Sequence, residues 1–270
     1  MPDLSPAIRP VILALANQKG GVGKTTTTIN LAAALAELGL RVLIIDLDPQ
    51  GNASTGLGVP AAMRLKTSYD VIIDGLPLTK AVLETSIDRL YICPSNSDLS
   101  SADLELVSNA KRSFLLFDAL RDPCVDELNL DFVLIDCPPS LSLLTVNALV
   151  ASHAVLVPLQ AEFYALEGLS QLLLTVREVR QSANPSLRIE GVVLTMVDSR
   201  NKLAQQVEND ARKTLGSLVF STVIPRNVRL SEAPSFAQSI LAYDSSSKGA
   251  EAYRNLAAEL LQHHPRRSPH

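Results

Sequence analysis

The strongest sequence signal for the fold is the stretch LANQKGGVGKTTTT, residues 15–28. It follows an apolar run and opens a helical pattern, and in that setting backbone N–H groups and a helix N-terminus converge on phosphate oxygens. The usual phosphate-binding loop reads Gly, four residues, then Gly-Lys-Ser/Thr. Counting back from the Gly-Lys-Thr at 23–25, Gln18 stands where the first glycine would be, and Lys19 opens the loop. The loop therefore carries a second lysine that needs an explanation.

The loop residues predict a site for a nucleoside triphosphate. Lys24 would reach the β- and γ-phosphates, and the hydroxyl of Thr25 would hold Mg²⁺. The alternative is a glycine-rich turn with an incidental Lys-Thr pair, and the strand-loop-helix setting argues against it. The residues expected to contact the nucleotide are Lys19, Gly20, Gly21, Val22, Gly23, Lys24, Thr25 and Thr26.

Composition limits the classes of protein to consider. The chain has 270 residues, of which 47% are hydrophobic and 19% charged, as is ordinary for a globular core. We expect one domain over 10–262, with a flexible N-terminal tail 1–9 and a disordered C-terminal tail 263–270. The net charge of −4 means that any contact with nucleic acid needs a local basic patch. Three cysteines without ligand-like spacing indicate a reducing cytoplasm.

Apolar runs alternate with helical patterns along the chain. Several runs are apolar at nearly every position, as strands covered on both faces are. The alternation predicts an α/β fold, a doubly wound and mostly parallel sheet with helices on both faces. The expected strands are 10–16, 41–46, 89–93, 131–136, 154–159, 189–195 and 218–224, and the expected helices are 24–38, 142–151, 166–182, 202–215 and 248–262.

One stretch, 137–161, has no Asp, Glu, Lys or Arg and is long enough to cross a bilayer. Three prolines together with Asn147 and His153 interrupt it. We therefore expect a buried helix followed by a buried strand instead of a membrane span.

Carboxylates end two of the expected strands. Asp46 and Asp48 follow RVLII, and Asp136 follows DFVLI. In an open α/β sheet the ligand lies at these carboxyl ends. Asp136 would bind Mg²⁺ through water, as the Walker B aspartate does in nucleotide-hydrolysing proteins. Each aspartate taken alone could simply cap the next helix or turn, but together with the loop they predict a metal-nucleotide site.

Four stretches in the same order resemble the ParA/Soj family of DNA-segregation ATPases, a branch of the deviant Walker A, MinD-like group of P-loop NTPases. The resemblance runs from about residue 10 to about residue 260. The stretches are KGGVGKTTTTINLAAALAELGLRVLIIDLDPQGNAST (19–55), IDCPPSLSLLTVNAL (135–149), EFYALEGLSQL (162–172) and IPRNVRLSEAPS (224–235).

The resemblance explains the second lysine. In that family the lysine that opens the loop, here Lys19, reaches across an ATP-dependent homodimer to the partner's nucleotide. Electrostatics supports this role. Two lysines in one loop repel each other, and a triphosphate that faces the two-fold axis supplies negative charge for the second one. The resemblance also implies that Asp48 orients the attacking water on a mobile loop, 48–58, so that intrinsic hydrolysis is slow and a partner accelerates it. Asp46 would support the Mg²⁺ site indirectly, by positioning the groups that bind the ion.

The base is predicted to be adenine. Familiar GTPases carry an Asn-Lys-x-Asp motif that binds guanine. The most similar stretch in this sequence is NKLA at 201–204, and it lacks the aspartate. The resemblance places the adenine against the loop 225–228, which contains Pro225 and Asn227. The expected cofactors are thus ATP and Mg²⁺.

A basic cluster stands out from the acidic chain. Between residues 199 and 229 there are six basic residues and two acidic ones. Phosphate contacts by such residues give affinity for nucleic acid without sequence preference, whereas composition alone would also suit a solvated charged face. The resemblance favours non-specific double-stranded DNA, bound through Arg200 and Arg229. Arg226 and Lys202 are the further candidates.

The resemblance implies chromosome or plasmid partition on the nucleoid in the cytoplasm, with a ParB-like centromere-binding protein as activator and no membrane. Three alternatives stay open. A ParA-like ATPase can position a protein complex instead of DNA. A MinD-like membrane ATPase would need a basic amphipathic C-terminal helix, yet this one carries Glu251 and Glu259. A nitrogenase-iron-protein-like reductase would need Cys93 and Cys137 to hold an Fe–S cluster between subunits.

Overall fold

The computed structural model describes residues 9–162, 165–198 and 200–265. Its sheet has seven strands in the order β3-β4-β2-β5-β1-β6-β7. All neighbouring strands are parallel except β3, which runs antiparallel to β4. The strands are β1 Val11–Leu15, β2 Val42–Asp46, β3 Leu83–Glu84, β4 Leu90–Cys93, β5 Phe132–Asp136, β6 Ala154–Gln160 and β7 Arg188–Thr195. The predicted doubly wound, mostly parallel fold is confirmed.

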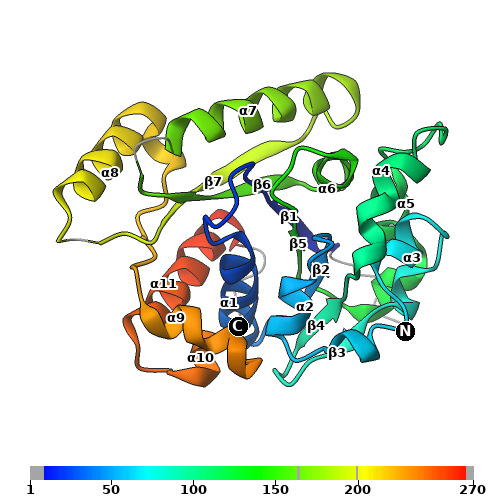
Figure 1. Ribbon diagram of the computed structural model, residues 1–270, viewed down its shortest axis with the longest axis horizontal. Helices are drawn as coiled ribbons and strands as arrows, with labels where there is room; N and C mark the ends of the chain where they lie inside the picture. Colours follow the sequence, from blue (N-terminus) through cyan, green and yellow to red (C-terminus); the bar gives the residue numbers. More distant parts are fainter. Residues whose placement is uncertain (1–8, 163–164, 199, 266–270) are drawn as a thin grey trace, which may run out of the picture.

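Helices cover both faces of the sheet (Figure 1). In the view of Figure 1, α7 lies on one side of β6 and β7, while α1 and α11 lie on the other. The helices are α1 Lys24–Glu37, α2 Asn52–Gly56, α3 Ser68–Ile72, α4 Ala102–Glu105, α5 Leu115–Leu120, α6 Leu143–Ala151, α7 Ala165–Ser182, α8 Lys202–Leu215, α9 Val228–Glu232, α10 Ile240–Tyr243 and α11 Lys248–His263.

Strand β2 shows why the apolar runs are continuous. Leu43 and Ile45 belong to the core cluster on the α6 and α7 side, whereas Val42 and Ile44 belong to the cluster on the α1 and α11 side. Successive side chains of a strand point to opposite faces, so a strand between two layers buries every residue. The same reasoning explains the uncharged stretch 137–161, which forms α6 and β6 as expected. In the part of the chain that the structure describes, no helix has the length and apolarity to span a bilayer.

The expected strand 218–224 is wrong. This segment lies beside β7 but makes only separate contacts with it, among them a hydrogen bond from the N–H of Phe220 to the carbonyl of Val192. The N–H groups of Ser221 and Thr222 instead donate to the carboxylate of Glu259 on α11, at 2.6 and 2.9 Å. In a regular strand the N–H of Thr222 would point to β7 like that of Phe220, and because Glu259 takes this donor the ladder is interrupted. Apolarity alone could not reveal this competitor.

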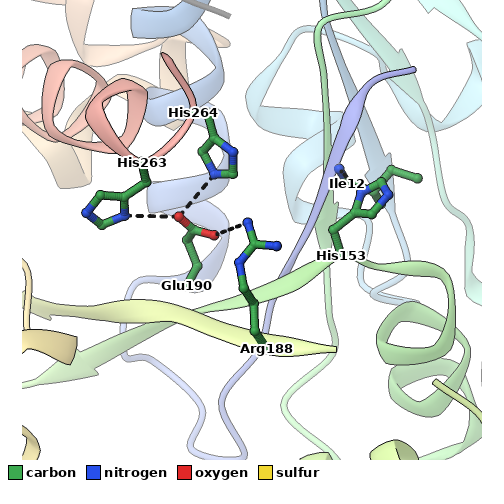
Figure 2. Close-up of polar contacts among 6 residues, drawn as sticks. All are labelled: Ile12, His153, Arg188, Glu190, His263 and His264. Carbon is green, nitrogen blue, oxygen red and sulfur yellow. Dashed lines mark hydrogen bonds and ion pairs between the residues drawn. The ribbon is translucent and has the colours of Figure 1, made fainter. Parts of the chain in front are cut away.

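The end of α11 extends past the domain boundary expected at residue 262. Figure 2 shows the buried carboxylate of Glu190 on β7 between His263 and His264, whose Nδ1 and Nε2 atoms each lie 3.0 Å from its Oε1. Arg188 approaches its other oxygen at 3.3 Å. These contacts fix the helix end to the sheet. The expected tails lie almost wholly outside the described residues, at 1–8 and 266–270.

Candidate nucleotide-binding site

The loop of residues 16–23 joins β1 to α1 at the carboxyl edge of the sheet. Gly23, directly before the helix, has φ 84°, a backbone conformation that favours glycine. Two polar side chains outside the loop motif anchor it. Asn17 donates to the carbonyl of Pro158 at 2.8 Å, and Thr195 at the end of β7 donates to the carbonyl of Val22 at 2.8 Å. Asn17 and Thr195 gave no signal in the sequence, since single polar residues beside a strand are common.

Lys24, the first residue of α1, is 6% exposed, and its Nζ donates to the carbonyl of Lys19 at 3.0 Å. Burial lowers the pKa of Lys24 below its ordinary value, against the opposing effect of the nearby carboxylate of Asp136. The ammonium thus lies inside the loop, as expected of the lysine that binds phosphates of the same subunit.

Asp136 ends β5 and reaches the first turn of α1. Its Oδ2 accepts from the hydroxyl of Thr25 at 2.7 Å, and its Oδ1 accepts from Thr28 at 2.9 Å. Burial raises the pKa of Asp136, and the neighbouring carboxylate of Asp46 raises it further. A cation would relieve this cost, because the buried carboxylate would then face positive charge.

A hydroxyl and a carboxylate in contact fit the prediction that Thr25 and Asp136 hold Mg²⁺. Hard oxygen donors suit this ion, which is usually bound by one or two protein groups together with substrate phosphates. Among the described residues there is no group of three His, Cys, Asp or Glu side chains that could hold a metal alone. The site therefore fits a magnesium-nucleotide complex rather than a metal bound by protein alone.

Asp46 and Asp48 lie together at the end of β2, where β2 pairs with β5 so that Asp46 stands opposite Asp136. The Asp46 carboxylate accepts from the N–H of Asp48 at 3.1 Å, and from the N–H and hydroxyl of Ser54 at 2.9 and 2.7 Å. These donors lie in the segment that follows β2: Asp48 is directly after the strand, and Ser54 is in α2. Asp48 is 7% exposed, and its Oδ1 accepts from the N–H of Gln50.

A cavity of about 310 Å³ opens beside the loop. Its lining includes Gly23 and Thr26 on one side and Pro225 and Asn227 on the other. The wall at Pro225 is held to the end of β7, because the N–H of Ile224 donates to the carbonyl of Leu194 and residues 224 and 226 both hydrogen-bond to Val197, just beyond the strand. The two segments expected to contact the nucleotide thus line one cavity.

Lys19 differs from Lys24 in position. Its side chain is 42% exposed, and its Nζ forms an ion pair with Oε2 of Glu162 at 2.8 Å, just beyond β6. Four other loop residues predicted to touch the nucleotide lie between the two lysines: Gly20, Gly21, Val22 and Gly23. The two ammonium groups therefore have different surroundings. That of Lys24 is buried inside the loop, and that of Lys19 is at the surface beside Glu162.

Two of the four expected DNA-binding residues, Arg200 and Arg226, line a cavity that adjoins the nucleotide cavity. A second cavity, of about 640 Å³, is lined by Arg200 and Arg226 and also by Lys248 at the start of α11, which the sequence did not single out. Pro225 and Arg226 line both cavities. Lys202 begins α8 and Arg229 lies in α9, outside this lining. The structure therefore gathers two of the four candidates in one groove.

Arg200 and Arg229, the two arginines expected to bind DNA, each donate hydrogen bonds to a carboxylate of the same chain. Asp198 accepts from Nε and Nη2 of Arg200 at 3.0 and 3.1 Å. Glu232 accepts from Nη1 of Arg229 at 3.0 Å. These hydrogen bonds raise the pKa of each arginine above its ordinary value and lower the pKa of Asp198.

Cys93 and Cys137 do not suit an iron–sulfur cluster shared between subunits. Both side chains are at most 1% exposed, and burial raises the pKa of each thiol. Cluster ligands are thiolates, and a shared cluster needs them at the surface. These two cysteines are core residues.

Comparison with known proteins agrees with this geometry. A family model described as an AAA domain matches residues 11–189. The chromosome partitioning protein ParA of Caulobacter vibrioides is 54% identical over 250 residues, which cover 93% of this chain and 93% of that protein. The chromosome-partitioning ATPase Soj of Thermus thermophilus is 53% identical over 249 residues, covering 92% of this chain and 94% of that protein.

Solved structures share the fold. A protein of Mycobacterium smegmatis, described as cobyrinic acid a,c-diamide synthase with bound ADP and magnesium, is 38% identical with a TM-score of 0.81, and the match covers 95% of this chain and 96% of that one. The cell division ATPase MinD of Pyrococcus furiosus is 27% identical with a TM-score of 0.75, covering 93% and 98%. The phosphate loop, the strand-end carboxylates and these relatives lead to one conclusion: the chain is a P-loop ATPase that belongs to the ParA/Soj family of chromosome-partitioning proteins.

Proposed function

We propose that this ATPase dimerises on binding ATP, that the dimer binds double-stranded DNA without sequence preference, and that a ParB-like centromere-binding partner stimulates hydrolysis during chromosome or plasmid segregation. Its cofactors are ATP and Mg²⁺, held by the loop, Thr25 and Asp136. The observation that carries the proposal is that the two lysines of the loop differ in burial and in their partners. Lys24 is buried in the loop, whereas Lys19 is exposed and its ammonium pairs with Glu162 beyond β6.

The exposed lysine supports ATP-dependent dimerisation. An ammonium outside its own loop can neutralise the phosphates of a second subunit that faces it across a two-fold axis. Such a contact stabilises the dimer only while the γ-phosphate is present. It also supplies positive charge in trans to the transition state, as an arginine finger does.

Two features support DNA as the ligand of the dimer. Arg200, Arg226 and Lys248 line one groove, and this groove shares a wall with the nucleotide cavity. A dimer doubles the number of phosphate contacts, so its DNA affinity exceeds that of the monomer. Localisation on the nucleoid follows from this binding.

The membrane alternative finds no support in α11. Leu256 and Leu260 on its apolar face are fully buried against the core beside α1. An interfacial helix needs such a face for the lipid.

The test is an anisotropy titration of unrelated DNA duplexes with ATP, with ADP and at two salt concentrations. We expect tight binding with ATP alone, little difference between duplexes, and a steep loss of affinity with salt. Equal affinity with ATP and ADP would remove the switch from the proposal. No binding in any nucleotide state would favour a protein complex as the cargo.

A further inference from the structure

The backbone of Asp48 is held on both sides by buried side chains. Its N–H donates to Oδ1 of Asp46 at 3.1 Å, and its carbonyl accepts from the hydroxyl of Ser95 at 2.5 Å. Asp46 and Ser95 are both fully buried. They come from adjacent parallel strands, because Asp46 ends β2 and Ser95 lies two residues beyond β4.

Ser54 in α2 closes these contacts into a ring. Its hydroxyl donates to Oδ2 of Asp46 at 2.7 Å and accepts from the N–H of Ser95 at 3.1 Å. Ser54 is also fully buried. The four hydrogen bonds thus form a closed network of buried groups. Such a network holds the backbone of Asp48 in one position.

We propose that Ser54 and Ser95 act with Asp46 as positioning residues for hydrolysis, holding Asp48 where its carboxylate orients the attacking water. This inference rests on the role of Asp48 in the proposed function. Within the described part of the chain, the carboxylate of Asp48 accepts a hydrogen bond from a residue of its own loop, the N–H of Gln50. The ring therefore supplies the link between this loop and the rigid sheet.

Position is what catalysis by an oriented water requires. A displacement of about 1 Å in a reacting group can cost about a hundredfold in rate. Side chains that hold a catalytic group are most effective when they come from rigid elements. Ser95 meets this condition, because it follows β4, which pairs with β2 and β3 in the sheet.

A folding role alone would also explain buried serines, so the test needs a matched control. Ser152 serves this purpose. Its hydroxyl is buried and donates to the carbonyl of Ala148 at 2.6 Å, at the end of α6 and away from the Asp48 loop. Ser152→Ala removes the same kind of hydrogen bond without touching the ring.

The experiment compares Ser95→Ala, Ser54→Ala and Ser152→Ala in the full chain. Circular dichroism and thermal melting establish folding, equilibrium titration gives ATP affinity, and phosphate release gives kcat. We expect Ser95→Ala and Ser54→Ala to lower kcat at least about tenfold with ATP affinity within about twofold. Ser152→Ala should keep the parent kcat.

A double variant separates positioning from folding. In the Asp48→Ala background, Ser95→Ala should change the residual turnover no further, because the group it positions is gone. An additional loss there, or a kcat of Ser95→Ala and Ser54→Ala equal to that of Ser152→Ala, would overturn the inference. If Ser95→Ala does not fold, Ser54→Ala decides by the same comparison. Full turnover by Asp48→Ala alone would instead refute the proposed role of Asp48.

Discussion

Nζ of Lys19 lies 2.8 Å from Oε2 of Glu162, so the lysine that opens the phosphate loop is paired with a carboxylate of its own chain. Both side chains are about half exposed. Exposed pairs of this kind contribute little to stability. The pair therefore restrains Lys19 only weakly, and we expect a triphosphate with several negative charges to replace Glu162 as its partner.

Lys19→Ala should bind ATP yet remain monomeric, because Lys24 still binds the phosphates within the subunit. Glu162→Gln should strengthen the ATP-dependent dimer by up to about fivefold, since it removes the competing charge. Light scattering in the Asp48→Ala background measures both effects without loss of ATP. Glu178→Gln, an exposed change on α7, is the control. A Lys19→Ala dimer of normal strength would contradict the role in trans.

Lys24→Ala and Asp48→Ala should differ in which step they block. Lys24→Ala removes the buried ammonium and should lower ATP affinity at least about a hundredfold. Asp48→Ala should retain ATP binding and lose hydrolysis, because it removes only the group that orients water. Equilibrium binding and phosphate release on both variants measure the two effects. Undiminished turnover by Asp48→Ala would exclude its assignment.

Arg200 and Asp198 should have opposite effects on DNA binding. Arg200→Glu should weaken binding, whereas Asp198→Asn should strengthen it by about fivefold, because the arginine no longer shares its hydrogen bonds with a carboxylate. Arg229→Glu should weaken DNA binding in the same way, and none of the three changes should alter ATP-dependent dimerisation.

Asp88→Asn is the matched control, since Asp88 pairs with Arg89 at 3.5 Å on another surface and the change in charge is the same. Anisotropy titrations at two salt concentrations compare the four variants. Equal strengthening by Asp88→Asn and Asp198→Asn would mean that net charge, and not the groove, decides the affinity.

Glu190 should make stability depend on pH. Hydrogen bonds from His264 and His263, together with Arg188, outweigh the effect of burial and lower the pKa of Glu190 below its ordinary 4.5. A lowered folded-state pKa stabilises the fold above the unfolded pKa, and the stabilisation is lost as pH falls through the folded value. Glu190→Gln should therefore cost about 2 kcal/mol at pH 7 and progressively less below pH 4.5.

Denaturant unfolding of both proteins from pH 7 to pH 3.5 measures this difference. Glu37→Gln, which breaks an exposed pair with Arg254, is the control and should cost less than about 1 kcal/mol. A constant difference between Glu190→Gln and the parent across this range would contradict the ion-pair account shown in Figure 2.

Local sequence patterns predicted most of the framework. Six of the seven expected strands and all five expected helices form within one or two residues of their expected bounds, because burial on both faces and helical periodicity act over a few residues. The short helices α2, α3 and α5 gave no periodic pattern, since one or two turns are too short to show one. The failure at 218–224 came from Glu259, a residue distant in sequence that competes for backbone donors.

Short contiguous motifs were enough to identify the phosphate loop with its extra lysine, the strand-end aspartates and the family, because local chemistry explains each motif. Which side chains meet could be learned only from the folded chain. Asn17 and Thr195 fix the loop, Ser95 reaches Asp48, and Lys248 joins Arg200, and each of these contacts spans tens of residues or more in the chain. The physical reason is that a hydrogen bond or a groove depends on the distance between atoms, and only packing of the sheet and its helices brings such residues together.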